Sequence, residues 1–255
     1  MIFVFNKDRI KTYLVSMLTV AMLIIFSNIG NIKSIQTSSV PKYLPIYNVK
    51  TDEKKIAFTM NCAWNAADID SILETLKNNN VHITFFMVGD WVDKYPEAVK
   101  KINEAGHEIG SHSNTHPHVN KLSAEKNLEE INLSVAKIQK ITGQKANIYR
   151  APYGEYNNTV IKTAEENGYY TIQWNLDTLD YKGLTGEQMW NRLKNKLENG
   201  AIILSHNGTK HTADSLDMLI KNIKASGFQV TTVSEIIYKD NYSINNNGTQ
   251  IRNQK

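Results

Sequence analysis

The sequence predicts an α/β protein whose parallel strands form a distorted (β/α) barrel of about seven strands. Between residues 53 and 240, short apolar segments alternate with segments of helical periodicity. The alternation repeats about seven times in about 190 residues, which favours a barrel-like closure over an open sheet. Polar and ionisable residues also gather where the predicted strands end, which is where such barrels carry their sites.

The strands are predicted from short apolar segments that are rich in β-branched and aromatic residues and are bounded by turn residues. The first is residues 55–59, a buried strand that leads into a polar segment beginning at Asn61. The later strands are expected at residues 81–88, 107–110, 147–150, 169–174, 201–204 and 228–231.

The helices are predicted from apolar residues at helical spacing, as in residues 68–80, where Ile69, Ile72 and Leu76 share one face. The longest helix, residues 123–142, begins at Ser123 and ends before Gly143, which are favourable residues for the two helix ends. The other helices are expected at residues 95–105, 158–167, 187–197 and 216–225.

The N-terminal segment, residues 1–30, is a separate unit. Lys7, Arg9 and Lys11 precede an uncharged apolar run over residues 13–26, which is the pattern of a secretory signal. The run is shorter than the roughly 20 residues of a transmembrane helix. An uncleaved signal-anchor, a cleaved signal peptide and a buried core helix remain open. The preceding positive charges favour a cytoplasmic N-terminus and an exported C-terminal domain. In a bacterial cell, which we expect here, this domain would be secreted or held at the outer face of the cytoplasmic membrane by this helix.

The flanks of the domain are polar. Residues 31–52 are predicted to be a linker and residues 241–255 an Asn-rich tail, so the folded domain is expected at residues 53–240. The net charge is +4, and no Lys/Arg block is interleaved with aromatic residues, which argues against a nucleic-acid partner. The single cysteine excludes an internal disulfide bond.

His112 and His116 give the strongest local signal for chemistry. Their spacing of four places both imidazoles on one face of a helical turn, where they can reach one divalent ion. Ser113 follows the first histidine where a metalloprotease helix has glutamate, which argues against that class. The alternative is a pair of surface histidines in a polar loop.

Four further ionisable residues follow predicted strands. Arg150 can hold a carboxylate or an oxyanion, or it can be a structural partner of an acid. His206 follows a very apolar strand and is either a general acid or base or a satisfied core histidine. Asp177 and Asp180 can orient His206 or Arg150, or can cap a loop.

Five segments together resemble the motifs of the polysaccharide deacetylases, the NodB-like carbohydrate esterases. In chain order they are Asn61-Cys62, His112-Ser-Asn-Thr-His116, Arg150-Ala-Pro-Tyr153, Asp177-Thr-Leu-Asp180 and Leu204-Ser-His206. The resemblance covers about residues 54–238. It implies a metal-dependent hydrolase, with zinc the expected ion, that removes N- or O-acetyl groups from a peptidoglycan-like or chitin-like polysaccharide.

The resemblance also implies a role for each matching residue. His112 and His116 would be metal ligands, Arg150 would hold the catalytic base, and His206 would be the general acid. Asp177 or Asp180 would tune His206, and the backbone of Tyr153, after Pro152, would help to form the oxyanion site. Trp64 and Trp174 are candidate platforms for sugar rings, although core or rim packing is the alternative for each aromatic side chain.

The first motif departs from the family pattern. Where the family has Thr-Phe-Asp-Asp-Gly, this chain has Thr59-Met-Asn-Cys-Ala63. Asn61 stands at the position of the base and cannot take a proton. Cys62 stands at the position of the third metal ligand; a thiolate can bind zinc, but a small buried hydrophobic residue is the alternative. Three functions remain open: a deacetylase, a catalytically impaired glycan-binding module on the same scaffold, and a hydrolase of small amides.

Overall fold

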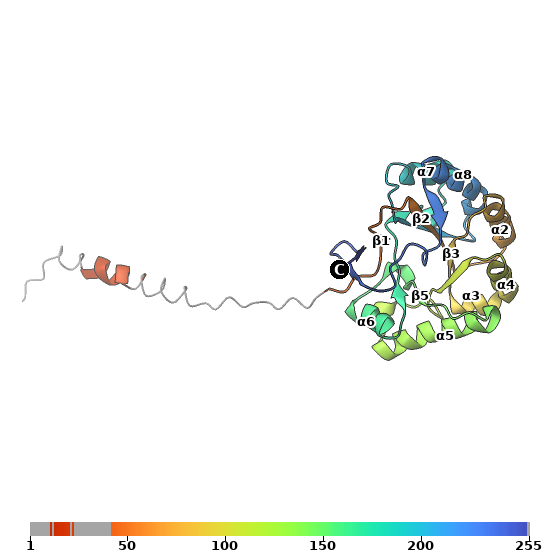
Figure 1. The fold of residues 1–255 in the computed structure, drawn as a ribbon. Coiled ribbons are helices and arrows are strands. Elements are labelled where there is room, and N and C mark those ends of the chain that lie inside the picture. Colours follow the sequence, from red (N-terminus) through yellow and green to blue (C-terminus); the bar gives the residue numbers. More distant parts are fainter. Residues whose placement is uncertain (1–10, 12, 21, 23–41, 254–255) are drawn as a thin grey trace, which may run out of the picture. The chain divides into compact units, whose positions relative to one another are not determined.

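The computed structural model describes residues 11, 13–20, 22 and 42–253 (Figure 1). The chain divides into two compact units, Met1–Pro41 and Lys42–Lys255. The described residues of the first unit are helical, and much of the predicted signal segment 1–30 lies outside the described residues. Among the helices that are described, none combines the length and the apolar character needed to cross a membrane.

The second unit is built on a curled parallel sheet, which confirms the predicted fold class. Its strands lie in the order β6-β5-β4-β3-β2-β8-β7, and β9 also pairs with β2. Every pairing in this sheet is parallel. The strands are β2 (Lys55–Cys62), β3 (Thr84–Met87), β4 (Glu108–Ser111), β5 (Ile148–Tyr149), β6 (Tyr170–Thr171), β7 (Leu176–Asp177), β8 (Ile202–His206) and β9 (Gln229–Thr231).

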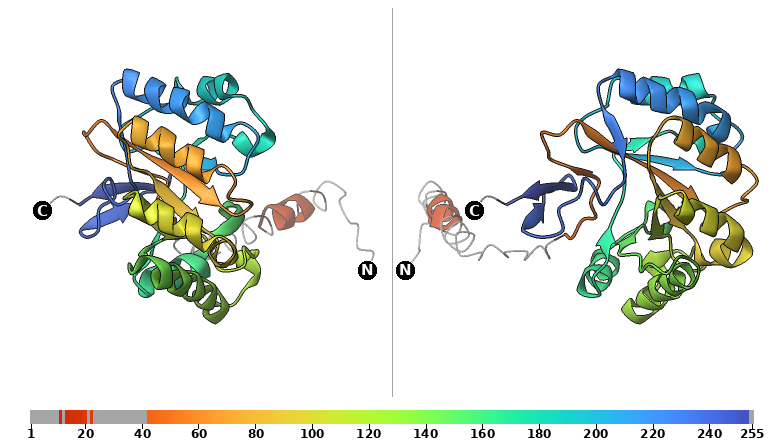
Figure 2. Two further views of the ribbon diagram at one scale, coloured as in Figure 1. Left: turned by 90° about the vertical axis from the view of Figure 1, so that its right-hand side faces the viewer. Right: turned by 45° about the vertical axis from the view of Figure 1, so that its right-hand side comes forward.

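The helices lie on the outside of the curled sheet, as Figures 1 and 2 show. The Ser123 hydroxyl accepts a hydrogen bond from Lys126 N at the start of α5, which ends at Gly143 in the left-handed conformation. Sequence therefore predicts both ends of this helix. The helices are α2 (Ile69–Asn78), α3 (Gly89–Lys94), α4 (Pro96–Glu104), α5 (Ala124–Thr142), α6 (Asn158–Glu166), α7 (Gly186–Leu193) and α8 (Thr212–Ala225).

The central strand β2 has two different buried faces. Phe58, Met60 and Cys62 belong to the large apolar cluster that also contains residues of α2, α4, α7 and α8. The alternate residues Thr59 and Asn61 face the other side, where both bind Arg150. This alternation follows from the period of two in a strand. It separates Cys62 from Asn61, although the two are neighbours in sequence.

The predicted domain, residues 53–240, is too short at both ends. The expected linker 31–52 includes β1 (Asn48–Val49), and the expected tail 241–255 includes β10 (Tyr242–Ile244) and β11 (Thr249–Arg252). β11 pairs with both β1 and β10 in a second, three-stranded sheet. Gln250 is fully buried and exchanges two hydrogen bonds with the backbone of Tyr238. This sheet is held by backbone pairing and by a buried amide. Because its residues are mostly polar, the sequence did not indicate strands there.

Candidate functional site

A pocket of about 490 Å³ opens at the carboxyl ends of the strands. It gathers residues from the last residues of β2, β7 and β8 and from the segments that follow β2, β4, β5, β6 and β7, which is the placement expected for a parallel barrel. Most of the residues singled out by sequence therefore meet in one place. The lining residues are Asn61, Ala63, Trp64, His112, His116, Ala151, Tyr153, Gly154, Trp174, Asp177, Tyr181, Leu204 and His206.

His206 is oriented by Asp180. The Nδ1 atom of His206 lies 2.8 Å from Asp180 Oδ1, and Asp180 Oδ2 accepts hydrogen bonds from His206 N and from Thr212 Oγ1. The Asp180 side chain is buried, so this pair is shielded from water. An imidazole held in this way can present its Nε2 atom to the pocket as a proton donor or acceptor.

Asp177 is placed differently from Asp180. It lines the pocket and its Oδ1 accepts a hydrogen bond from Leu179 N, with no hydrogen bond to His206. Burial raises the pKa of its carboxyl. Of the two aspartates that sequence left open as partners of His206, Asp180 is the one in contact.

Arg150 lies directly beneath the pocket and is completely buried. Its Nη1 donates to Thr59 Oγ1 at 2.8 Å and to Asn61 Oδ1 at 3.0 Å, and its Nη2 donates to the Gln173 carbonyl at 3.1 Å. The guanidinium also packs on the ring of Phe86, 4.1 Å from the centroid. None of these partners is a carboxylate. Burial lowers the pKa of Arg150 to about 9.

His112 and His116 are brought together as predicted, with ring centroids 4.9 Å apart. The Nδ1 atom of His112 lies 2.8 Å from the carbonyl oxygen of Arg150, which fixes the ring. Burial, together with the neighbouring His116, holds the pKa of His112 well below its usual value. Burial also lowers the pKa of His116. Both rings line the pocket as neutral imidazoles at neutral pH, the form that binds a metal ion.

The third expected ligand is not beside these histidines. Cys62 is fully buried in the apolar cluster on the helix-facing side of β2 and does not line the pocket. Burial raises the pKa of its thiol well above the ordinary value, and the charge of Asp68 adds to this, whereas a zinc ligand must be a thiolate. Within the described residues, no group of three or more His, Cys, Asp or Glu side chains is arranged to hold a metal ion. The donor set therefore does not fit a three-ligand zinc site.

Aromatic side chains form the rim of the pocket. Trp64, Tyr153 and Tyr181 are 48%, 59% and 48% exposed, which is unusual for large aromatic residues. The rings of Trp64 and Tyr181 flank His206, and Tyr153 contacts His116. Trp174 also lines the pocket, whereas Pro152 is buried and is not part of the lining. Exposed rings around a polar floor suit the apolar faces of sugar rings.

Glu130, on α5, fixes the loop that carries the histidines, and no sequence motif indicated it. Its Oε2 accepts hydrogen bonds from Ser113 Oγ, Asn114 N and Thr115 N, and its Oε1 accepts one from Thr115 Oγ1. Burial alone would raise the pKa of Glu130, but these hydrogen bonds lower it. Ser113 and His116 have positive φ angles of 69° and 59°, so the loop needs such support.

Replacing Glu130 with glutamine is expected to lower the free energy of unfolding by about 1–2 kcal/mol, because an amide NH₂ would then face donor groups. Urea unfolding measures this change, and the backbone NMR signals of residues 113–116 should shift. Glu129→Gln is the matched control, since Glu129 is exposed and, within residues 42–253, its salt bridge is with Lys126. Equal effects of the two substitutions would contradict the role of Glu130.

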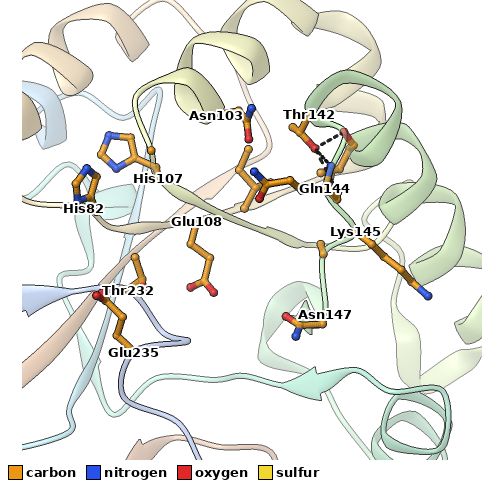
Figure 3. Close-up of a pocket in the computed structure, with 14 residues that line it drawn as sticks. His82, Asn103, His107, Glu108, Thr142, Gln144, Lys145, Asn147, Thr232 and Glu235 are labelled. Atoms are coloured by element: carbon orange, nitrogen blue, oxygen red, sulfur yellow. Dashed lines mark hydrogen bonds between the residues drawn. The ribbon is translucent and has the colours of Figure 1, made fainter. Parts of the chain in front are cut away.

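A second cavity, of about 380 Å³, lies at the amino ends of the strands and contains none of the predicted site residues (Figure 3). Its walls come from the start of β4, the end of α5 and residues 232–235. His107 lines it and packs edge-on against His82 and Phe85. This cavity is separate from the pocket around His112.

A parallel α/β scaffold that gathers imidazoles and carboxylates at the carboxyl ends of its strands carries a candidate enzyme active site. Residues 48–172 match the family model "Polysaccharide deacetylase". The chain belongs to this family, as its motifs led us to expect.

Two of the relatives are proteins of the bacteria Bacillus subtilis and Listeria monocytogenes. YlxY of Bacillus subtilis is 35% identical over 76% of this chain and 60% of its own length. The peptidoglycan-N-acetylglucosamine deacetylase PgdA of Listeria monocytogenes is 35% identical over 80% of this chain and 41% of its own length. The chain thus spans about half the length of these two relatives.

Among solved structures, a CE4 family pseudoenzyme from Bacillus anthracis matches with a TM-score of 0.73 and 33% identity, over 76% of this chain and 69% of that one. A mutant of the same protein, described as having restored enzymatic activity, matches equally well, with a TM-score of 0.73. The proteins similar to this chain therefore include named deacetylases and one described as a pseudoenzyme.

Proposed function

We propose that this chain binds an N-acetylated glycan of the cell wall in the pocket around His112, and that it hydrolyses acetyl groups far more slowly than an enzyme with a carboxylate at position 61. One observation carries the proposal: Asn61 lies on the pocket floor, bonded to Arg150, where a catalytic base would have to lie. An amide cannot take a proton from water, and a general base typically contributes about 100- to 10,000-fold to the rate.

Three further features support binding. The exposed rings of Trp64, Tyr153 and Tyr181 can stack on sugars. The names of PgdA and other relatives support peptidoglycan as the polymer. The likeness to a pseudoenzyme of the same family supports a scaffold that has kept its shape without its full catalytic set.

The second candidate is the metal-dependent deacetylase that the resemblance implies. The observation in its favour is that His112, His116 and His206 all line the same pocket, with Asp180 orienting His206. In this candidate zinc would be held by His112 and His116 without a third protein ligand. Metal content and acetate release, measured on one preparation, decide between the two candidates.

We also propose that the domain acts outside the cytoplasmic membrane. The basic and apolar segments of residues 1–30 support export, and the peptidoglycan named for the relatives lies in the cell wall. Retention by an uncleaved N-terminal helix is part of this proposal. Proteolysis of intact cells tests the location, and the mass of the purified protein tests cleavage.

The binding proposal is tested by titration calorimetry of the full chain with tetra-N-acetylchitotetraose and with soluble peptidoglycan fragments. We expect saturable binding, with acetate release undetectable both with and without added zinc. Trp64→Ala should weaken binding about 3- to 10-fold through the loss of stacking. The control Leu133→Ala removes another exposed apolar side chain, on α5, and should change nothing. Rapid acetate release by the unmodified chain would overturn the proposal.

A further inference from the structure

We propose that the pocket recognises the acetamido group itself, through one hydrogen-bond donor and one acceptor whose polarities are fixed by Arg150. The side-chain amide of Asn61 donates to the acetyl carbonyl, and Nε2 of His112 accepts from the acetamide N–H. This inference rests on the proposed glycan binding and goes beyond it, because it names the chemical group of the glycan that the pocket recognises.

The orientation of the Asn61 amide follows from its neighbour. A guanidinium has only donors, so the atom of Asn61 that lies 3.0 Å from Arg150 Nη1 must be the oxygen Oδ1. The NH₂ group is then the other end of the side chain. It makes no hydrogen bond within residues 42–253, and Asn61 lines the pocket. The floor of the pocket therefore presents a donor.

The tautomer of His112 is fixed by the same residue. A backbone carbonyl only accepts, so Nδ1 of His112, 2.8 Å from the carbonyl oxygen of Arg150, must carry the proton. In the neutral ring, Nε2 is then an acceptor. It makes no hydrogen bond in the described part of the chain, and the ring lines the pocket.

The two groups stand on different strands, as a secondary amide requires. The C=O and N–H of a trans amide point in opposite directions, so their partners must lie on two sides of it. The register places Asn61, Phe86 and Gly110 in one row across β2, β3 and β4, and His112 follows Gly110 by two residues on the same face. β2 and β4 are two strand spacings apart, roughly 10 Å, which leaves room for a planar amide between the side chains.

This pair discriminates against the two nearest analogues. A deacetylated amino sugar has no carbonyl for Asn61, and its ammonium group would approach the buried charge of Arg150. An O-acetyl ester has no N–H for His112. Each analogue leaves a desolvated polar group unpaired, which corresponds to a loss of affinity of about 10-fold or more.

The test compares tetra-N-acetylchitotetraose with the fully deacetylated tetramer, by calorimetry on the full chain in the presence of EDTA. We expect the acetylated tetramer to bind at least about 10-fold more tightly. In Asn61→Asp the group that faces the pocket becomes an acceptor, and the preference should disappear. Asn191→Asp is the matched control, because it adds the same charge on the exposed face of α7, outside the pocket.

The outcomes separate this inference from the proposed function. If neither tetramer binds, glycan binding itself is overturned. If both tetramers bind equally, or if Asn61→Asp still prefers the acetylated tetramer, glycan binding stands and the recognition of the acetamido group by Asn61 and His112 is overturned. A second measurement does not depend on the variant: the side-chain NH₂ signals of Asn61 in the NMR spectrum of the unmodified chain should shift with the acetylated tetramer alone.

Discussion

The double substitution Asn61→Asp/Cys62→Asp is expected to raise acetate release from N-acetylated glycan by at least about 100-fold over the unmodified chain. The carboxylate introduced at position 61 would lie on the pocket floor, where Arg150 keeps it ionised and able to accept a proton. The carboxylate introduced at position 62 cannot remain unpaired in the apolar cluster around Phe58 and Met60. Because the side chain of residue 62 faces the helices, completing a three-ligand metal set with His112 and His116 requires the end of β2 to rearrange, and the cost of burying this charge favours that rearrangement.

Initial rates of acetate release, measured with added zinc, check this expectation. Cys62→Ser in place of Cys62→Asp is the control for the second position, since it adds a small polar group without a charge. His206→Ala, made in the double variant, should remove most of the gain, because His206 supplies the only imidazole held by a buried aspartate in the described chain. If the unmodified chain releases acetate as fast as the double variant, the inference from Asn61 is wrong.

Acidification from pH 6.5 to pH 4 is expected to lower the free energy of unfolding by about 3 kcal/mol through His107 alone. Burial, with a smaller contribution from His82, lowers the pKa of His107 to about 4. The side chain is only 8% exposed, and its Nδ1 accepts a hydrogen bond from Ile83 N, which a proton on that atom would break.

The direction follows from proton binding in the two states. Between pH 6.5 and pH 4 the unfolded chain binds a proton at His107 and the folded chain does not, so stability falls as the pH falls. Below pH 4 both states are protonated and this contribution levels off. Buried His112 acts in the same direction.

Urea unfolding at a series of pH values between 7 and 4 measures this slope. His107→Gln should be less stable at neutral pH and should show a shallower slope. His211→Gln is the control, because His211 lies at the start of α8, outside the cavity of Figure 3. An unchanged slope in His107→Gln would assign the acid sensitivity to other groups.

Sequence predicted the position of the site better than the conformation of its parts. Strand ends could be located from apolar segments, so Asn61, His112, Tyr153, Asp177 and His206 were correctly expected to meet. The motif also placed Cys62 there, although the alternation of β2 sends every second side chain to the helices. In this instance the strand period was the better guide to the side-chain direction.

Two other features, the role of Glu130 and the second sheet, leave no recognisable pattern in the local sequence. Glu130 is one of several charged residues on α5, and only the folded loop shows that it binds Ser113, Asn114 and Thr115. The hairpin of β10 and β11 is polar, and its pairing with β1 joins segments about two hundred residues apart, as the register Asn48 with Thr249 shows. Long-range backbone pairing of this kind leaves no periodic apolar pattern.

The absence of a carboxylate among the hydrogen-bond partners of Arg150 has a consequence for how this chain can evolve. A buried cation without a bonded counter-ion destabilises the fold, because its desolvation is only partly offset. Asn61→Asp, which returns that counter-ion, is therefore expected to stabilise the protein at neutral pH, as urea unfolding midpoints would show. A single substitution at position 61 would therefore supply a candidate base and stabilise the fold at the same time. Selection for stability alone would thus favour a carboxylate beside Arg150, whatever its effect on catalysis.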